Sequence, residues 1–320
     1  MSTVIVTGVS GYIGGQVALQ LQDAGHTVLG IDCRQLPLHL LDVCDKFLLQ
    51  DFASDDAHRF ILAYRPDAIV HCAGTSLVGP SMLNPSEYYN NNAVKTLKLL
   101  DLVCKAMPQT RFIFSSSAAV YGEPILTPCE EIDPASPISP YGESKLMIEM
   151  MLQSYHKAYG LDFVAFRYFN ACGADPQGRH GQEPGATHII ARVLESIRDG
   201  QEFVLYGNDY ATADGSCVRD YVHVADIARA HVLALSKIVP SGIYNLGSNT
   251  GTSNQQIIAA AQRITDQMVE VAIGPKRAGD PPELTASAEK FSRLVDWRKF
   301  SLDDMIQHAW AWYVRQNKKV

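Results

Sequence analysis

A tyrosine and a lysine, Tyr141 and Lys145, lie four positions apart in the sequence Tyr-Gly-Glu-Ser-Lys. At this spacing two side chains share one face of a helix. Ser139 and Pro140 come directly before them and predict a helix with Ser139 as N-cap and Pro140 in its first turn. A free phenol has a pKa of about 10, and a nearby ammonium group makes it easier to use as a base. The pair is a candidate acid–base couple, although the same pair also occurs on helices as ordinary surface or packing residues.

Ser117 offers a second hydroxyl close to this pair. It follows the apolar stretch 111–115, which has the composition of a buried strand, and open α/β sheets bind ligands at the carboxyl ends of their strands. A hydroxyl there could hydrogen-bond both the phenol and a substrate oxygen, while a simple turn serine is the plainer interpretation. The chain has no Gly-x-Ser-x-Gly string, so a hydrolase nucleophile is not indicated.

Three glycines, Gly8, Gly11 and Gly14, follow the first apolar stretch, where a strand turns into a helix. This spacing lets a pyrophosphate approach the backbone and rest on the helix N-terminus, although glycines in a tight turn would look similar. Asp32 closes the next strand, where a carboxylate accepts hydrogen bonds from the adenosine ribose and repels a 2′-phosphate. The context favours NAD over NADP, with Arg34 as the residue that could instead recruit the phosphate.

Short runs rich in Val, Ile and Phe alternate with stretches of helical periodicity. Runs that are apolar on both faces are typical of buried parallel strands, and their alternation with helices predicts an α/β fold with a doubly wound, Rossmann-type sheet. The expected strands are 3–7, 27–32, 47–50, 68–72, 111–115, 163–169 and 243–246, and the expected helices are one from about residue 13 and others near 55–63, 86–106, 140–158 and 224–236.

The pattern changes after Asn170. A Gly/Pro-rich stretch, 173–185, leads into an expected helix over 187–199, a strand over 203–206 and helices near 253–265 and 302–316. We therefore expect an NAD-binding Rossmann domain over residues 1–170 and a smaller, interleaved α/β substrate domain over 171–320. Segments near 218–248 are expected to return to the first domain.

The composition limits the classes of function. Of the 320 residues 47% are apolar and 19% charged, as in an ordinary globular protein. The net charge of -7 and the lack of long Lys/Arg runs argue against nucleic-acid binding, and no apolar stretch approaches the roughly 20 residues of a membrane helix. Seven scattered cysteines fit reduced thiols better than disulfides or zinc ligands, and no secretory signal is recognised. We expect a cytoplasmic protein that binds no metal, nucleic acid or membrane.

Longer strings are more specific than these single motifs. They are VHCAG (70–74), PSEYYNNN (85–92), FIFSSSAAVYG (112–122), YGESKL (141–146), RYFN (167–170), GNDY (207–210), VRDYVHV (218–224), YNLG (244–247) and RAGDP (277–281). With the glycine motif they resemble the extended short-chain dehydrogenase/reductase superfamily of NAD-dependent epimerases and dehydratases, and within it the UDP-glucose 4-epimerases. The resemblance runs nearly end to end.

This resemblance implies an isomerase that interconverts UDP-galactose and UDP-glucose through a 4-keto intermediate. Tyr141 would take the proton of the sugar 4-hydroxyl while NAD+ takes the C4 hydride. Lys145 would tune the phenol and hold the nicotinamide ribose, and Ser117 would share the proton path. The keto sugar would then turn about its link to the diphosphate and receive the hydride on its other face, so that NAD ends unchanged and stays bound.

The remaining site residues are carried over by the same resemblance. The cofactor would be held by Gly8, Gly11, Tyr12, Ile13, Gly14, Asp32, Asp51, Phe52, Ala73, Gly74, Asn92, Tyr141, Lys145 and Tyr168. The UDP-sugar would be held by Ser117, Tyr141, Asn170, His188, Ile189, Val204, Tyr206, Arg219, Arg277, Asp280 and Leu284. The family also implies a homodimer that pairs through the two helices near 86–106 and 140–158.

Some positions depart from the common family pattern or leave the substrate open. Lys95 stands where glycine is usual, and Leu284 aligns with the position whose bulk governs whether N-acetylated sugars fit. The related 4,6-dehydratases place Asp-Glu after the hydroxyl residue, whereas Ala118 and Ala119 follow Ser117 here. A 4-epimerase of UDP-N-acetylhexosamines, UDP-glucuronate or UDP-arabinose, an NAD(P)H-dependent dehydrogenase or reductase, and a non-catalytic NAD-sensing protein remain as alternatives.

Overall fold

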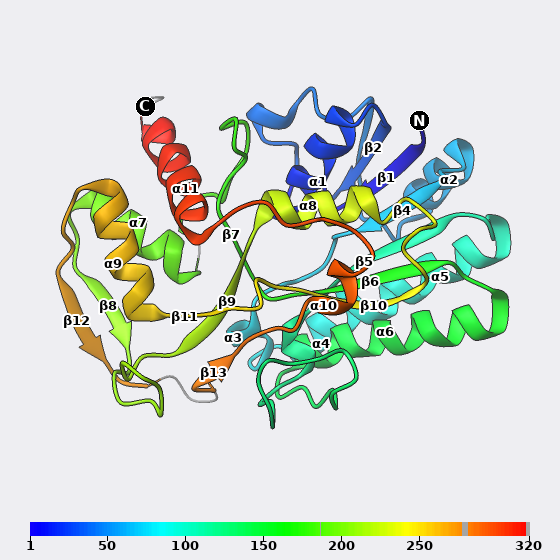
Figure 1. Cartoon of the computed structure of the whole chain (residues 1–320). Coiled ribbons are helices and arrows are strands. Elements are labelled where there is room, and N and C mark those ends of the chain that lie inside the picture. Colours follow the sequence, from blue (N-terminus) through cyan, green and yellow to red (C-terminus); the bar gives the residue numbers. More distant parts are fainter. Residues whose placement is uncertain (186, 277–280, 318–320) are drawn as a thin grey trace.

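A parallel sheet of seven strands forms the larger part of the molecule (Figure 1). The computed structural model describes residues 1–185, 187–276 and 281–317. In spatial order the strands are β10 (Gly242–Leu246), β6 (Phe163–Tyr168), β5 (Arg111–Ser117), β4 (Ala68–His71), β1 (Thr3–Thr7), β2 (Thr27–Asp32) and β3 (Lys46–Leu49). Every neighbouring pair is parallel. The predicted doubly wound α/β fold is confirmed.

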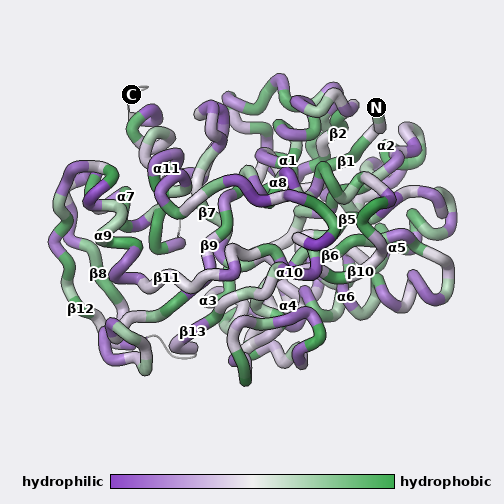
Figure 2. Tube along the Cα trace, in the orientation of Figure 1, coloured by the Kyte–Doolittle hydropathy of each residue, from purple (hydrophilic) through white to green (hydrophobic). Residues whose placement is uncertain are grey.

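Helices cover both faces of this sheet. On one face α1 (Tyr12–Asp23) packs against α8 (Val224–Leu233), and on the other α2 (Asp55–Tyr64), α5 (Lys95–Ala106) and α6 (Pro140–Tyr159) form the second layer (Figure 1). Each layer has its own apolar core against the sheet. In Figure 2 green and purple alternate along many helices, as expected of helices with one buried and one exposed face.

The helix expected near 86–106 is present as one uninterrupted helical run, but part of it is not α-helical. After a separate short helix, α3 (Val78–Ser81), the run comprises α4 (Pro85–Tyr88), a π-helical stretch, Tyr89–Val94, and α5. Such stretches are rare and frequently occur at functional sites. Here it carries Asn92, which is 1% exposed, into the interior beside α6.

The smaller part contains two sheets and three longer helices. Helices α7 (Ile189–Asp199), α9 (Asn254–Thr265) and α11 (Leu302–Asn317) pack around one core, with the short α10 (Glu289–Ser292) nearer the large sheet. One sheet joins β11 (Gly251–Ser253), β9 (Val218–His223) and β13 (Glu283–Leu284), with β7 (Asn170–Cys172) also on β9, and the other pairs β8 (Phe203–Tyr206) with β12 (Val271–Gly274). Single 3-10 turns lie at Leu38–Leu40 and Ala118–Val120.

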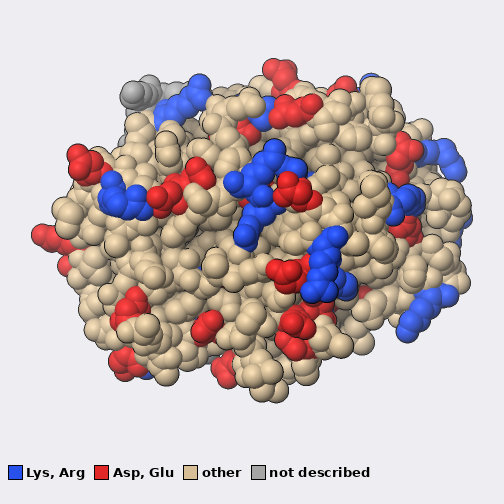
Figure 3. Space-filling model, in the orientation of Figure 1, with Lys and Arg blue, Asp and Glu red and all other residues tan. Residues whose placement is uncertain are grey.

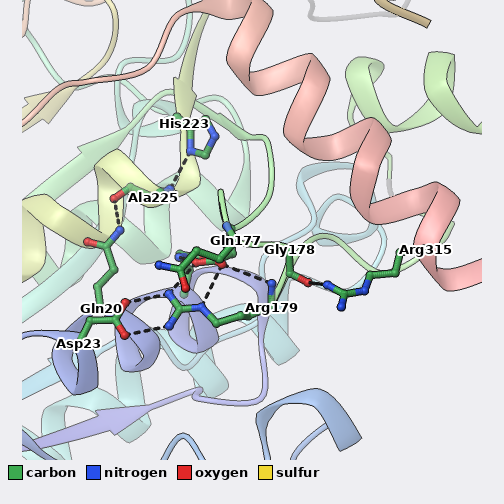
Figure 4. A network of polar contacts seen from close by, with 10 residues as sticks. Gln20, Asp23, Gln177, Gly178, Arg179, His223, Ala225 and Arg315 are labelled. Atoms are coloured by element: carbon green, nitrogen blue, oxygen red, sulfur yellow. Dashed lines mark hydrogen bonds and ion pairs between the residues drawn. The ribbon is translucent and has the colours of Figure 1, made fainter.

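The loop between β7 and α7 ties the two parts together (Figure 4). The guanidinium of Arg179 donates to both carboxylate oxygens of Asp23 on α1, at 2.8 and 2.7 Å, and also to Asp175 within the loop. On the other side Arg315 of α11 donates to the Gly178 carbonyl at 2.9 Å. The loop therefore connects the first helix of the chain with the last one.

On the face drawn in Figure 3, acidic and basic side chains lie interspersed in small groups. Among the described residues, no helix combines the length and the apolar character needed to span a bilayer.

Candidate active site

Helix α6 presents the Tyr141–Lys145 pair as the sequence predicts. The Ser139 hydroxyl accepts a hydrogen bond from the Gly142 amide at 3.2 Å, so it caps the helix that begins at Pro140. The pair is followed on the same face by Ile148 and Leu152, both fully buried. Packing of this face against the sheet fixes the direction in which the pair points.

Lys145 is held inside the protein at the end of β5. Its side chain is 5% exposed, and Nζ donates a hydrogen bond to the Ser115 carbonyl at 2.8 Å. Burial lowers the pKa of Lys145 to about 8, because the charged form loses its hydration. The residue is still mostly a cation at pH 7 and supplies a positive charge in this pocket.

Tyr141 lies beside this charge and beside Ser117. The Lys145 Nζ is 5.8 Å from the centroid of the Tyr141 ring. Burial raises the pKa of the Tyr141 phenol, while a hydrogen bond with Ser117 acts in the opposite direction. Ser117 ends β5, directly opposite Tyr168 on β6 in the strand register. The structure thus gathers Tyr141, Lys145, Ser117 and Tyr168 at the carboxyl ends of two neighbouring strands.

A hydrogen-bond network that the sequence does not predict supports this group from behind. The Tyr168 hydroxyl lies 2.8 Å from Ser115 Oγ and 2.6 Å from His231 Nε2, and Ser115 Oγ lies 3.1 Å from Cys72 Sγ. Burial lowers the pKa of His231 to about 4, so this histidine is neutral at pH 7. Residues from β5, β6, α8 and the turn directly after β4 meet here, which no local sequence pattern could have indicated.

The glycine-rich turn after β1 forms a cradle that only glycine permits. Gly8 has φ +75°, and a Cβ there would lie 2.6 Å from the Ala73 amide nitrogen. A Cβ on Gly14 would lie 2.1 Å from the Gly8 carbonyl oxygen. The turn therefore brings bare backbone to the start of α1, where Tyr12 and Ile13 begin the helix. This is the arrangement that binds a pyrophosphate.

Asp32 lies beside the cradle. One of its carboxylate oxygens accepts from the Ser10 amide at 3.0 Å and the other from the Arg34 amide at 2.9 Å. The Arg34 side chain is 68% exposed, with its Nε 3.7 Å from the same carboxylate. A carboxylate at this point can accept hydrogen bonds from ribose hydroxyls. The Arg34 guanidinium lies close to the Asp32 carboxylate.

Asn92 connects α6 with the turn after β4. Its Oδ1 accepts from the Thr75 amide at 2.8 Å, and its Nδ2 donates to Ser144 Oγ at 2.9 Å. Gly74, at φ +152°, leaves no room for a side chain, since a Cβ would lie 2.8 Å from Asn92 Oδ1. The amide thus holds Ala73 and Gly74 against the helix that carries Tyr141.

Asp51 and Phe52 follow β3 on the same edge of the sheet. Phe52 is 7% exposed and packs against the buried His71 ring with centroids 4.8 Å apart. The Asp51 carboxylate pairs with Lys95 Nζ at 2.6 Å, and Lys95 also donates to Asn91. Lys95, which stands where the family usually has glycine, is therefore an ion-pair partner of Asp51.

Three of the residues expected to hold the UDP-sugar line a separate pocket. Ile189, Val204 and Tyr206 line it together with Thr187, Arg192, Phe203, Leu205 and Asn254. His188 is the exposed N-cap residue of α7, directly before Ile189. Helix α7 and strand β8 build this pocket, and Arg192 is a lining residue that the sequence does not single out.

The other expected sugar-nucleotide residues lie on adjacent strands of the four-stranded sheet. Asn170 on β7 donates to the Asp220 carbonyl at 2.8 Å, and Leu284 on β13 lies opposite Arg219 on β9. Leu284 also packs against a buried cluster that includes Tyr121 and Phe169. The predicted residues Arg277 and Asp280 lie outside the described residues. Within the described ranges, no three His, Cys, Asp or Glu side chains gather as metal ligands.

The family model for the NAD dependent epimerase/dehydratase family matches residues 4–247. The chain belongs to this family. The family resemblance and the NAD dependence expected from the sequence are thereby confirmed. The chain is 40% identical over 319 residues to the UDP-glucose 4-epimerase of Halalkalibacterium halodurans, covering 97% of this chain and 95% of that protein. It is also 40% identical to that of Lacticaseibacillus casei, over 97% and 96% of the two chains.

Solved structures agree with this assignment. UDP-glucose 4-epimerase from Brucella ovis, in complex with NAD, superposes with a TM-score of 0.91 at 36% identity, over 97% of this chain and 98% of that one. The enzyme from Stenotrophomonas maltophila with bound NAD and formylated UDP-arabinopyranose gives a TM-score of 0.94 at 29% identity, over the full length of both chains. The likeness therefore covers both the large sheet and the smaller part.

Proposed function

We propose that this chain interconverts UDP-galactose and UDP-glucose by epimerisation at C4 and keeps one NAD bound throughout. The observation that carries the proposal is the meeting of Tyr141, Ser117 and the buried Lys145 at one edge of the sheet. The names of the relatives, whose likeness covers nearly the whole chain, point to the same reaction.

The residues at this edge fit NAD. The bare backbone at Gly8 and Gly14 would receive the pyrophosphate, Asp32 the adenosine ribose, and Asp51 and Phe52 the adenine. Tyr12, Ile13, Gly11, Ala73, Gly74, Asn92 and Tyr168 would line the rest of the cofactor. When bound, NAD supplies a hydride acceptor and donor for C4 of the sugar.

Two side chains of this protein would transfer the proton, and a third would stabilise the charge that the transfer creates. Tyr141 accepts the proton of the sugar 4-hydroxyl and returns it to the 4-keto sugar after the sugar has turned over, and Ser117 shares that proton. Burial alone makes the Tyr141 phenolate costly, so the Lys145 cation is needed to stabilise it. The network behind Lys145 fixes the carbonyl of Ser115 to which this cation is bonded.

Anchoring of the UDP group falls to the smaller part of the molecule. Ile189, Val204 and Tyr206 would hold the uracil, and Arg219 with Arg277 would bind the diphosphate, for which charge-assisted guanidinium bonds are well suited. Asp280 would contact the ribose, and Asn170 and His188 would lie along the nucleotide sugar. Leu284 would border the sugar itself. An anchor remote from C4 leaves the sugar free to turn.

We further propose a homodimer that pairs through α5 and α6. Apolar side chains on these helices and on the turn before α5 stay exposed, among them Leu97 at 40%, Met147 at 43% and Met150 at 60%. The two helices lie side by side on the outer face of the large sheet (Figure 1). Light scattering should give about twice the 35.1 kDa chain mass, and Met150→Glu should shift it toward one chain. A 35 kDa particle at all concentrations would contradict the dimer.

We also propose that the protein is located in the cytosol. We propose further that the chain divides near residue 170 into two interleaved domains. All seven cysteines are free thiols, as is typical of proteins in a reducing compartment. Segments β10 and α8, from the expected returning region 218–248, pack on the large sheet, while β9 belongs to the smaller part. These contacts support an interleaved arrangement of an NAD domain and a UDP-sugar domain.

The test is conversion of UDP-galactose without added cofactor. The purified protein is incubated with UDP-galactose, and UDP-glucose is followed by NMR, with UDP-N-acetylgalactosamine in parallel. Conversion without added NAD supports the proposed reaction with a retained cofactor. No conversion even with NAD supplied would contradict it and favour another UDP-sugar, or an NAD-sensing protein if every UDP-sugar failed.

A further inference from the structure

A buried ion pair lies one helical turn beyond Lys145. Glu149 is on the same face of α6 and is 1% exposed, and Arg167 on β6 is 4% exposed. The guanidinium donates from Nε to Glu149 Oε1 at 3.0 Å and from a terminal nitrogen to Oε2 at 2.7 Å. A bidentate pair of this kind fixes the relative orientation of its two side chains. It therefore fixes α6 against β6.

Ser116 of β5 joins this ion pair. Its hydroxyl donates to Glu149 Oε1 at 2.5 Å, and Ser116 lies opposite Arg167 in the register of β5 and β6. One carboxylate thus receives hydrogen bonds from two neighbouring strands and belongs to the helix that packs on both of them. The three elements that carry the proposed active site are joined at this point.

The two neighbours of Ser116 along β5 are active-site residues. The Ser115 carbonyl accepts the hydrogen bond of Lys145, and Ser117 shares a hydrogen bond with Tyr141. Successive side chains of a strand point to opposite faces, so Ser116 is held from the face opposite to the hydroxyls of Ser115 and Ser117. A shift of Ser116 would move both active-site contacts at once.

The charge of Glu149 also acts on Lys145, which is four residues earlier on the same helix face. The other titratable groups that face Lys145 are Tyr141 on α6, His71 at the end of β4 and Cys72 directly after it. Burial raises the pKa of Cys72 to about 11 and lowers that of His71 to about 3, so both are uncharged at pH 7. Burial lowers the pKa of Lys145, and the Glu149 carboxylate, together with its guanidinium partner on β6, is the charged group that opposes this effect.

We propose that Glu149 is a positioning residue for the C4 epimerisation. It holds the end of β5 against α6 so that Ser117 meets Tyr141, and its charge keeps Lys145 a cation. The inference rests on the proposed function. A buried ion pair is often no more stabilising than apolar side chains of the same size, so a contribution to stability alone does not account for charged groups at this place. A purely structural role would change stability and leave the pH dependence of the reaction as it is.

The test compares Glu149→Gln and Ser116→Ala with a control at the other end of the same two strands. Glu149→Gln keeps the size of the side chain and an acceptor for Ser116 but removes the charge, whereas Ser116→Ala removes one hydrogen bond and keeps the charge. The control, Asp162→Asn, weakens the ion pair of Asp162 with Arg111 at the amino ends of β6 and β5. For each NAD-loaded protein, kcat on UDP-galactose is measured from about pH 6 to 10, a range that spans the pKa of Lys145. UDP affinity is measured by calorimetry and stability by urea unfolding.

In Glu149→Gln we expect kcat at pH 7 to fall about ten-fold or more, with UDP affinity unchanged within about two-fold. The loss of activity at high pH should begin about one pH unit lower than in the parent chain, because Lys145 gives up its proton more readily without the neighbouring carboxylate. Ser116→Ala should lower kcat about three-fold without this shift, as for loss of one hydrogen bond. Asp162→Asn should change stability alone.

A pH profile of Glu149→Gln that matches the parent chain, or an equal fall in kcat in Asp162→Asn, overturns the inference. If Glu149→Gln does not fold, Ser116→Ala decides: a lower kcat with UDP affinity kept supports the inference, and an unchanged kcat overturns it. A parent chain that converts no UDP-galactose overturns the proposed function as well, whereas a failure confined to the variants leaves that function standing.

Discussion

The cofactor side and the nucleotide side of this site are built differently. The cofactor side, at the carboxyl ends of the large sheet, holds its polar groups inside: Lys145 is 5% exposed and Asn92 1% exposed, and both are hydrogen-bonded to neighbouring elements. The nucleotide side, formed by α7, β8, β9 and β13, presents short strands, with the exposed His188 at its rim.

This difference matches two different tasks. A cofactor that remains bound through every turnover can rest on a rigid, fully packed frame, whereas a substrate that enters and leaves needs groups left unpaired until it arrives. On the cofactor side Lys145 and Asn92 already have hydrogen-bond partners, whereas among the described residues the Arg192 side chain, which lines the nucleotide pocket, has no hydrogen bond and no ion pair. Changes on the first side should therefore affect NAD retention or chemistry, and changes on the second should affect UDP affinity.

The largest expected effect is loss of turnover in Tyr141→Phe. Removal of the phenol oxygen removes the proposed base, and general acid–base groups contribute roughly 10²–10⁴-fold to rates. We expect a fall in kcat of about 10³-fold or more with NAD and UDP still bound, measured by the NMR assay. Tyr159→Phe, on the exposed end of the same helix, is the control. Near-normal turnover in Tyr141→Phe would exclude the proposed mechanism.

The next effect concerns cofactor retention in Gly14→Ala. The added Cβ would lie 2.1 Å from the Gly8 carbonyl oxygen, so the cradle must distort. We expect the purified variant to contain little NAD, measured as nucleotide released on denaturation, while UDP affinity stays within about two-fold. Gly242→Ala, whose Cβ would make only ordinary contacts at 3.6 Å or more, should keep its NAD. Full NAD occupancy in Gly14→Ala would argue that the pyrophosphate lies elsewhere.

A smaller effect, on stability, is expected for Lys145→Met in the protein freed of NAD. The pKa of Lys145 is lowered to about 8, so the folded chain holds this proton less tightly than the unfolded chain does. At pH 7 this weaker proton binding lowers the free energy of unfolding of the parent chain by about 3 kcal/mol. The Lys145→Met variant avoids this penalty but loses the hydrogen bond to the Ser115 carbonyl, which stabilises the folded chain by about 1 kcal/mol. Lys145→Met should therefore raise the free energy of unfolding by about 2 kcal/mol at pH 7.

That gain has a definite pH dependence. As the pH rises from about 8 toward 10.5, the unfolded parent chain binds more protons than the folded one, so the parent chain gains stability and the advantage of Lys145→Met shrinks. Urea unfolding at pH 7 and pH 9.5 measures both values, with the exposed Lys105→Met as control. An advantage that is equal at the two pH values would show that Lys145 is not destabilised by burial.

The smallest effect is a change of substrate preference in Leu284→Ala. Leu284 packs beside Tyr121 and Phe169, and its truncation would enlarge the proposed sugar site. We expect the ratio of rates on UDP-N-acetylgalactosamine and UDP-galactose to rise about ten-fold, an effect in the range of one changed apolar contact. Leu38→Ala, 88% exposed, should leave the ratio unchanged. An unchanged ratio in Leu284→Ala would place the sugar away from β13.

The sequence predicts the cofactor side better than the nucleotide side for a physical reason. Ser139, Tyr141 and Lys145 follow from helix capping and periodicity, which are local, and Gly8 and Gly14 follow from a local turn. The supporting contacts of Tyr168 with His231 do not, because they depend on which strands and helices become neighbours in space.

On the nucleotide side even the elements were harder to predict. The sequence does not predict strand β12, Val271–Gly274, because the strand has only four residues, which are alternately exposed and half-buried. It pairs with β8, whose residues line the nucleotide pocket, so one wall of that pocket depends on a strand that the sequence does not indicate. The helix near 86–106 is predicted from its periodicity, but its π-helical part is not, because the buried Asn92 in that part bonds to α6, which lies far away in the sequence.

The position of β10 at one end of the large sheet also determines when this sheet can be completed during translation. The strand comprises Gly242–Leu246 and pairs with β6, which ends at Tyr168. Between the two, the chain builds α7, β8, β9 and α8. The large sheet therefore cannot close until most of the polypeptide has been translated, and a chain cut short before β10 would leave the flank of β6, with Phe166, without its covering strand.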